Sequence, residues 1–279
     1  MDDELSYMNN LDEVFELITS YYREINNITK IPDFELIFTK NVDTESIKLI
    51  SMIEQEEEIK YYNGNDTLNG RMLFKTEERP FVILINENQF DNKFSFLGTY
   101  YHELTHVIDY DKYMNQVDAK DIKELKIDNY HWVFYLWTEF HARYIGYSKY
   151  YEYINYANNY KENIGERIDY IENIEKSVHT NNIKNEILEY RTNVSIMPKN
   201  IAFQFLFYQI SQFYGRFAKW EEYGIKLEYD GNIILHEFPH IKKELINYYN
   251  ILLKCKDYNG YEQHKDELQN IINSLYERI

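Results

Sequence analysis

Apolar residues recur at helical spacing along most of this chain, and most continuously after residue 91. In the first such segment, Leu11, Phe15 and Ile18 fall on one side of a helix over residues 11–25, which Pro32 prevents from extending further. The chain has only nine glycines and four prolines, which favours long helices over a many-stranded sheet. Further helices are predicted over residues 44–56, 92–113, 121–157, 160–178, 181–191, 199–223, 240–255 and 261–278.

Short segments with a period of two, or with continuous apolar character between turn residues, predict strands. These are residues 34–38, 57–62, 71–75 and 81–86, and Asp230-Gly231 predicts a hairpin turn within 225–235. The fold is therefore expected to be α+β and predominantly helical, with a small sheet packed on a helix and a helical C-terminal half. Residues 1–160 would form the first domain and residues 161–279 a mostly helical region, which can also be part of one composite domain.

Charge and composition narrow the classes of partner. The formal net charge of −17 repels phosphate backbones and anionic lipid, so we expect neither a nucleic-acid partner nor a membrane partner. The N-terminal residues are acidic and polar, without the pattern of a signal peptide, and no stretch is apolar enough to span a bilayer; a cytoplasmic location is expected. The single cysteine, Cys255, excludes an intramolecular disulfide and a thiolate cluster, so a zinc site would use nitrogen and oxygen ligands.

The chemistry of the chain is concentrated in the run His102-Glu103-Leu104-Thr105-His106. Residues four apart lie over one turn of a helix, so the two imidazoles can reach one metal ion, and Glu103 can act as a general base beside it. The helix has an apolar side with Leu104 and an opposite side with His102, His106 and Asp109. The strand 81–86 precedes this helix and is expected to be an edge strand that pairs with extended substrate.

The same pattern occurs a second time, as His236-Glu237-Phe238-Pro239-His240. Pro239 lies inside this string, where its ring would clash with the preceding helical turn, and the string follows a segment that resembles a strand. His236 and His240 should therefore not share a helical face. We expect Pro239 to begin the helix that follows.

A catalytic zinc site needs a third protein ligand and leaves the fourth position open. The candidates are Glu139, His141, Asp109 and His131. Glu139 projects into the apolar stripe of its helix, where a carboxylate is costly unless it is paired or bound to metal; the alternative is an ion pair with Arg143 one turn later. Asp109 is better placed to orient the His106 ring than to bind metal.

Two segments resemble the gluzincins, which are zincins with a glutamate as third ligand. Residues 102–110 and 138–143 are similar to the active-site segments of the anthrax lethal factor and Pro-Pro endopeptidase group, and the likeness covers residues 81–150. The resemblance implies a zincin-like sheet, one zinc ion bound by His102, His106 and Glu139, and Glu103 as base. A weaker resemblance is to the ImmA/IrrE-type peptidases.

Members of the lethal factor group use a tyrosine about two turns before the ligand glutamate to stabilise the tetrahedral oxyanion. The corresponding residue here is Trp132, and Tyr130 and Tyr135 are the nearby substitutes. Asp109 and Arg143 would support the metal ligands from the outer shell.

These observations lead to the hypothesis of a zinc-dependent endopeptidase that acts on a peptide or protein substrate. One alternative is hydrolysis of a non-peptide amide by the same site. Another is an inactive zincin-like protein that binds a regulatory partner, and a third is a helical interaction module without metal. Because a structural zinc site does not need a base, the presence of Glu103 favours an enzyme. The sequence does not indicate the oligomeric state.

Overall fold

A computed structural model describes residues 11–51, 69–88, 95–157, 176–222, 224 and 233–279 of the chain. Over these residues the protein is mostly helical with one three-stranded sheet, which confirms the predicted α+β class. None of the described helices is both long and apolar enough to cross a membrane. The elements follow the chain as α1 (Leu11–Ile25), β1 (Phe34–Thr39), α2 (Val42–Ser51), β2 (Gly70–Leu73), β3 (Phe81–Asn86), α4 (Ser95–Val117), α5 (Ile122–Leu125), α6 (His131–Ala157), α8 (Lys176–Asn193), α9 (Lys199–Glu222), α10 (Ile233–Glu237), the 3₁₀ turn η5 (Pro239–Ile241), α11 (Lys242–Lys254) and α12 (Tyr258–Arg278).

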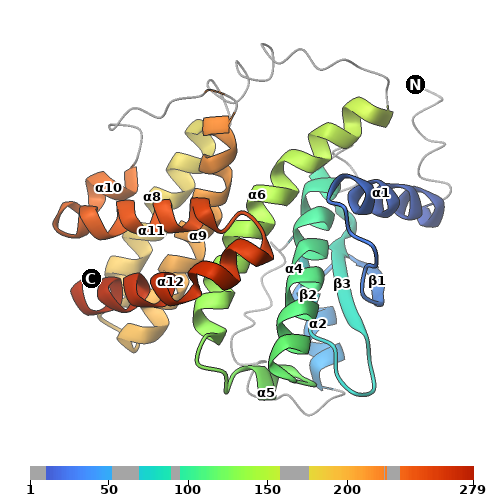
Figure 1. The fold of residues 1–279 in the computed structure, drawn as a ribbon, viewed down its shortest axis with the longest axis horizontal. Coiled ribbons are helices and arrows are strands. Elements are labelled where there is room, and N and C mark those ends of the chain that lie inside the picture. Colours follow the sequence, from blue (N-terminus) through green and yellow to red (C-terminus); the bar gives the residue numbers. More distant parts are fainter. Residues whose placement is uncertain (1–10, 52–68, 89–94, 158–175, 223, 225–232) are drawn as a thin grey trace.

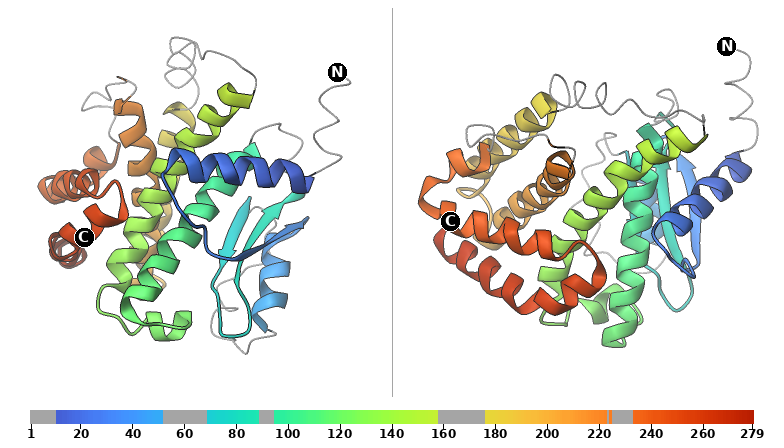
Figure 2. Two further views of the ribbon diagram at one scale, coloured as in Figure 1. Left: turned by 45° about the vertical axis from the view of Figure 1, so that its right-hand side comes forward. Right: turned by 45° about the horizontal axis from the view of Figure 1, so that its top comes forward.

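The sheet has the order β1-β3-β2, with β1 parallel and β2 antiparallel to β3. Alternate β3 residues face opposite sides: Phe81, Ile83 and Ile85 join the main core with α4, whereas Val82 and Leu84 pack with α2. Figures 1 and 2 show α4 and α2 on the two sides of the sheet. The expectation that strand 81–86 lies at an edge was wrong, because a continuous apolar run is typical of a strand covered on both faces. Among the described strands, β2 and β1 form the edges.

Helix α4, which carries the run from His102 to His106, is covered on two sides. Tyr101 and Leu104 are fully buried toward the sheet and α1, and the hydroxyl of Tyr22 on α1 hydrogen-bonds to that of Thr105 at 2.5 Å. On its other side α4 packs along α6, which is itself packed against α9. Figure 1 shows α4 and α6 side by side across the middle of the molecule. Side chains of α4 that face α6 are therefore buried.

The predicted helix 121–157 is broken into α5 and α6, which was not expected. Asp128 lies between the two parts, and its carboxylate accepts hydrogen bonds from the Tyr130 N–H at 2.6 Å and from the Tyr113 hydroxyl at 2.6 Å. A short acidic side chain that binds a backbone N–H two residues later favours a turn over a continuous helix. The break sets where α6 begins, at His131.

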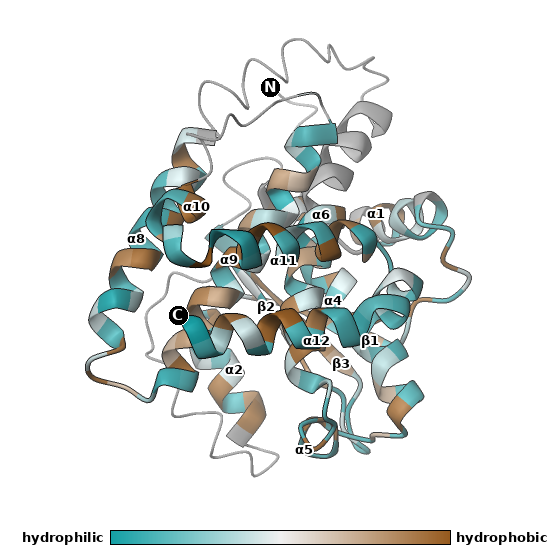
Figure 3. Ribbon diagram, turned by 60° about the vertical axis from the view of Figure 1, so that its left-hand side comes forward, coloured by the Kyte–Doolittle hydropathy of each residue, from teal (hydrophilic) through white to brown (hydrophobic). Residues whose placement is uncertain are grey.

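The C-terminal helices share one core with the first half of the chain. Trp137 on α6 stacks on Tyr261 of α12 at 4.6 Å between ring centroids, and its indole N–H donates to the carbonyl of Cys255 at 2.7 Å. Cys255 is a buried free thiol. Figure 3 shows hydrophobic patches along the otherwise hydrophilic helices α11 and α12. The domain boundary between residues 160 and 161 stays a prediction, because residues 158–175 lie outside the described part.

The remaining expectations for individual elements had mixed outcomes. The bounds of 11–25 and 81–86 are confirmed, and the two helices predicted at 160–178 and 181–191 correspond, where described, to the single helix α8. Strand 57–62 and residues 225–232 of the predicted hairpin lie outside the described residues. Ile233–Glu237 is a short helix, not a strand; helical geometry buries the adjacent Ile234 and Leu235 together, and this packing overrides their β propensity.

Candidate metal centre

Two imidazoles lie on one side of α4, as the spacing predicted. His102 and His106 are 4% and 5% exposed, and their Nε2 atoms lie 3.1 Å apart. Nitrogen atoms this close, both directed to the same point, can share one proton or one metal ion. The helix supplies this geometry because residues four apart are one turn apart.

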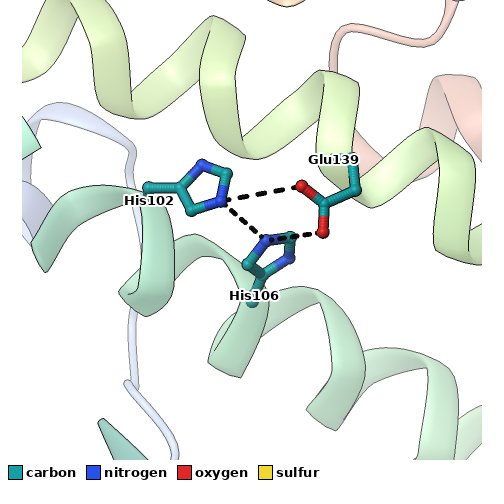
Figure 4. Close-up of side chains that lie close together, drawn as sticks. All are labelled: His102, His106 and Glu139. Atoms are coloured by element: carbon teal, nitrogen blue, oxygen red, sulfur yellow. Dashed lines mark hydrogen bonds and ion pairs between the residues drawn. The ribbon is translucent and has the colours of Figure 1, made fainter. Parts of the chain in front are cut away.

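The third group comes from α6. The carboxylate of Glu139 places Oε1 3.4 Å from Nε2 of His106 and Oε2 3.7 Å from Nε2 of His102, and Figure 4 shows the three side chains converging from two helices. Tetrahedral ligands at bond lengths of about 2.0–2.2 Å lie about 3.3–3.6 Å from one another, which is close to these separations. The buried cluster of His102, His106 and Glu139 could thus hold a metal ion.

Burial affects the two histidines differently. Burial lowers the pKa of His102 well below its ordinary value, and the charge of Arg143 adds to this effect, so His102 is the neutral imidazole that a metal requires. Burial also opposes protonation of His106, but the carboxylates of Glu139, Glu103 and Asp109 together outweigh it, and the net pKa of His106 is raised. In the absence of a cation, a proton on His106 partly compensates the buried charge of Glu139.

Glu103 lies beside this cluster without belonging to it. Its side chain is buried, and the backbone N–H of Met72 in β2 donates a hydrogen bond to its carboxylate. Burial raises the pKa of Glu103 above its usual range, and the neighbouring Glu139 also raises it. A carboxylate with a raised pKa beside a candidate metal site is suited to accept and return a proton.

A second set of side chains orients His106 from behind. Its Nδ1 lies 3.0 Å from the hydroxyl of Thr138, which donates to the carboxylate of Asp109 at 2.9 Å. His141 also binds Asp109, with Nδ1 2.7 Å from the carboxylate, and its ring stacks on Trp137. Of the candidates for third ligand, Asp109 and His141 thus pair with each other away from the cluster.

Glu139 is held by a residue that the sequence analysis missed. Gln212 on α9 donates from Nε2 to Glu139 at 2.8 Å, and its carbonyl oxygen accepts from Nε of Arg143 at 3.0 Å. The alternative considered for Glu139 was a direct ion pair with Arg143; among the described contacts, Gln212 bridges these two side chains instead. No local pattern indicated Gln212, because it lies 73 residues after Glu139 and reaches it only through the packing of α9 on α6.

The remaining candidates lie apart from the three ligand atoms. Tyr130 is partly exposed and donates a hydrogen bond to Asp266 on α12, whereas Tyr135 is partly buried and stacks on Tyr208 of α9. His131 begins α6, and burial lowers its pKa to about 4. It is not one of the three residues of the metal cluster.

The second His-Glu-x-x-His string does not form a site in the described structure. The chain changes direction at Phe238, between α10 and η5, with Pro239 in the first turn of η5. His236 and His240 are both exposed, and Glu237 pairs with Arg191 at 2.9 Å. Pro239 interrupts the helix at this point because its ring would clash with the preceding helical turn.

Comparison with known proteins identifies no relative. No protein-family model matches the chain, and no curated protein and no solved structure matches it significantly. Any functional inference rests on the geometry of the centre itself.

Proposed function

We propose that the chain is a zinc-dependent endopeptidase in which His102, His106 and Glu139 hold one zinc ion and Glu103 is the general base. The observation that carries the proposal is the convergence of three buried ligand atoms from α4 and α6 beside a fourth, non-ligating carboxylate. Two imidazole nitrogens and one carboxylate form a donor set typical of catalytic zinc. A purely structural site has no use for the additional base.

Each residue has a separate task in hydrolysis. A bound zinc ion would supply a Lewis acid that acidifies water and polarises the scissile carbonyl. Glu103 takes a proton from the attacking water and later delivers it to the leaving nitrogen, as its raised pKa favours. Gln212 and Thr138 hold Glu139 and His106 in place.

The edge of the sheet offers a place for the substrate backbone. The N–H of Asn86 donates to the carbonyl of Asn69, so alternation along β2 and β3 directs the N–H and C=O of Met72 away from β3. The hydrogen bond from the Met72 N–H to Glu103 agrees with this direction. An extended peptide that donates an N–H to the Met72 carbonyl would therefore run directly beside the general base. The substrate position that we propose is therefore along β2, in place of the β3 edge expected from the sequence.

The test compares the natural protein with Glu139→Ala, Glu103→Gln and the exposed control His236→Ala. We expect one zinc per chain in all but Glu139→Ala, in which affinity should fall by more than the 10–100-fold typical of outer-shell changes. In a peptide-library digest monitored by mass spectrometry, Glu103→Gln should lose cleavage while keeping its zinc. Absence of zinc after reconstitution, or cleavage that survives Glu103→Gln, would contradict the proposal. Zinc binding without cleavage of any peptide would contradict the peptidase activity alone.

A further inference from the structure

A phenol from α9 lies next to the proposed catalytic residues. Tyr208 is one turn before Gln212 on α9, and Gln212 donates a hydrogen bond to Glu139. The charges of Glu139, Arg143 and Glu103 all act on this phenol. Tyr208 therefore lies one turn from the side chain that binds the proposed zinc ligand Glu139, and its ring stacks on Tyr135, one turn before Glu139 on α6.

The hydrogen bonds made by the Gln212 amide do not use the hydroxyl hydrogen of Tyr208. The amide of Gln212 has two N–H groups: one donates to Glu139 at 2.8 Å, and the other can donate to the Tyr208 oxygen. The phenolic oxygen is then an acceptor in this contact, and its O–H remains to be donated elsewhere. Burial raises the pKa of Tyr208 well above its usual range, with Glu139 adding to the effect, so the O–H stays protonated at any working pH.

Neighbouring rings hold the Tyr208 ring in place. It stacks on Tyr135 with 5.9 Å between centroids and 22° between planes, and Tyr135 stacks in turn on Trp132 at 5.6 Å and 22°. All three rings are partly exposed, so the stack borders on solvent. A ring fixed in this way directs its hydroxyl with little loss of conformational entropy when substrate binds.

We propose that Tyr208 is a catalytic residue whose hydroxyl donates a hydrogen bond to the oxyanion that forms at the scissile carbonyl. The inference rests on the proposed peptidase function. Water adds to the carbonyl carbon, the electron pair of the C=O π bond moves to the carbonyl oxygen, and the proton of the water moves to Glu103. On collapse the C–N bond breaks and that proton passes to the leaving nitrogen. Tyr208 keeps its own proton throughout and binds most strongly when the oxygen is negative.

Kinetics provide the first test, with Tyr208→Phe as the variant, which keeps the ring and its stack. Removal of one oxyanion donor typically lowers kcat by about 10²–10³-fold. We expect that loss in Tyr208→Phe with KM little changed and with zinc content equal to that of the parent. Tyr130→Phe is the matched control, because its hydroxyl binds Asp266 away from the site. Tyr135→Phe tests the rival phenol; a loss that appears there and not in Tyr208→Phe would overturn the proposal.

A binding measurement tests the same residue without turnover, and so separates its failure from failure of the peptidase function. Methylphosphonate, a tetrahedral anion without side chains, is titrated into the cobalt-substituted protein while the visible absorption is recorded. Loss of one charge-assisted hydrogen bond should weaken its binding by about tenfold or more in Tyr208→Phe and leave Tyr130→Phe unchanged. Binding of 2-mercaptoethanol, which has no oxyanion, should be equal in all three proteins. Affinities within twofold of the parent, or no binding of methylphosphonate to the parent, would overturn the role of Tyr208.

Discussion

The hydroxyl of Thr138 lies between the ring of His106 and the carboxylate of Asp109, and this position fixes where the protons are. An ionised carboxylate can only accept, so the Thr138 hydroxyl donates to Asp109 and its oxygen accepts from Nδ1–H of His106. A singly protonated His106 ring therefore has its lone pair on Nε2, the atom that faces Glu139 and His102. Thr138 thus selects the tautomer that can bind a metal through Nε2.

Replacing this hydroxyl by a methyl group tests that role. Thr138→Val keeps the shape of the side chain but leaves the buried His106 Nδ1–H and Asp109 without their shared partner. We expect zinc affinity to fall by about 10–100-fold, the range typical of outer-shell partners. Competition with a chromophoric chelator measures this change. Thr138→Ser restores the hydroxyl and should recover most of the affinity, and a serine variant as weak as valine would show that packing, not the hydrogen bond, matters.

At the scale of elements, two glycines set how closely the three central helices approach. A Cβ at Gly146 of α6 would lie 2.9 Å from the backbone nitrogen of His102 in α4. A Cβ at Gly215 of α9 would lie 2.4 Å from the carbonyl oxygen of Phe140 in α6. Backbone atoms cannot move aside as flexible side chains do, so these contacts determine the distances between the helices that carry the ligands.

The contact at Gly146 predicts a defect in metal binding as well as in stability. Gly146→Ala should push α6 away from α4, and we expect a loss of about 1–3 kcal/mol in the free energy of unfolding from overpacking. Zinc affinity should fall together with stability, because Glu139 moves with α6. Gly260→Ala, at the start of α12, is the control. The added Cβ would lie 2.4 Å from the carbonyl oxygen of Lys254, so the clash is similar but does not involve α4 or α6. Urea unfolding of the apoprotein and chelator competition should show both losses in the first variant and only the stability loss in the second.

The elements also show which structural features could be predicted from local sequence patterns. The bounds of β3 followed from its apolar run, but its central position did not, because pairing partners of a strand are decided by segments distant in sequence. The break before α6 depends on Asp128 binding the Tyr130 N–H and the Tyr113 hydroxyl, a contact between separate segments. Helical spacing was sufficient for His102 and His106 because that geometry is local. It could not indicate Gln212 or Tyr208, whose relation to the centre exists only through the packing of α9 on α6.

At the scale of the whole molecule, the C-terminal helices contribute charge and burial around the candidate metal centre. Burial lowers the pKa of His179 on α8 to about 2, and the charges of Arg216 and Arg143 add to this effect. Arg143 acts on His102, and through Gln212 it contacts Glu139. The packing that completes the candidate metal centre therefore also keeps His179 neutral, and this has a measurable consequence for stability in acid.

The direction of that consequence follows from proton linkage. In the unfolded chain a histidine has a pKa of about 6.5, whereas His179 in the folded chain stays neutral down to about pH 2. Below pH 6.5 the unfolded state binds a proton that the folded state does not, so the free energy of unfolding decreases as the pH falls through this range. At pH 5 this single group should cost about 2 kcal/mol relative to neutral pH.

His179→Gln should remove that contribution, so that the variant loses about 2 kcal/mol less than the parent between pH 7.5 and pH 5. Urea unfolding at both pH values, with a chelator present throughout, measures the difference without a contribution from metal release. His236→Gln changes an exposed histidine and should follow the parent. If His179→Gln also followed the parent, then the protonated ring would be tolerated in the folded state, and α8 would not be packed closely enough to exclude a charge beside Arg216 and Arg143.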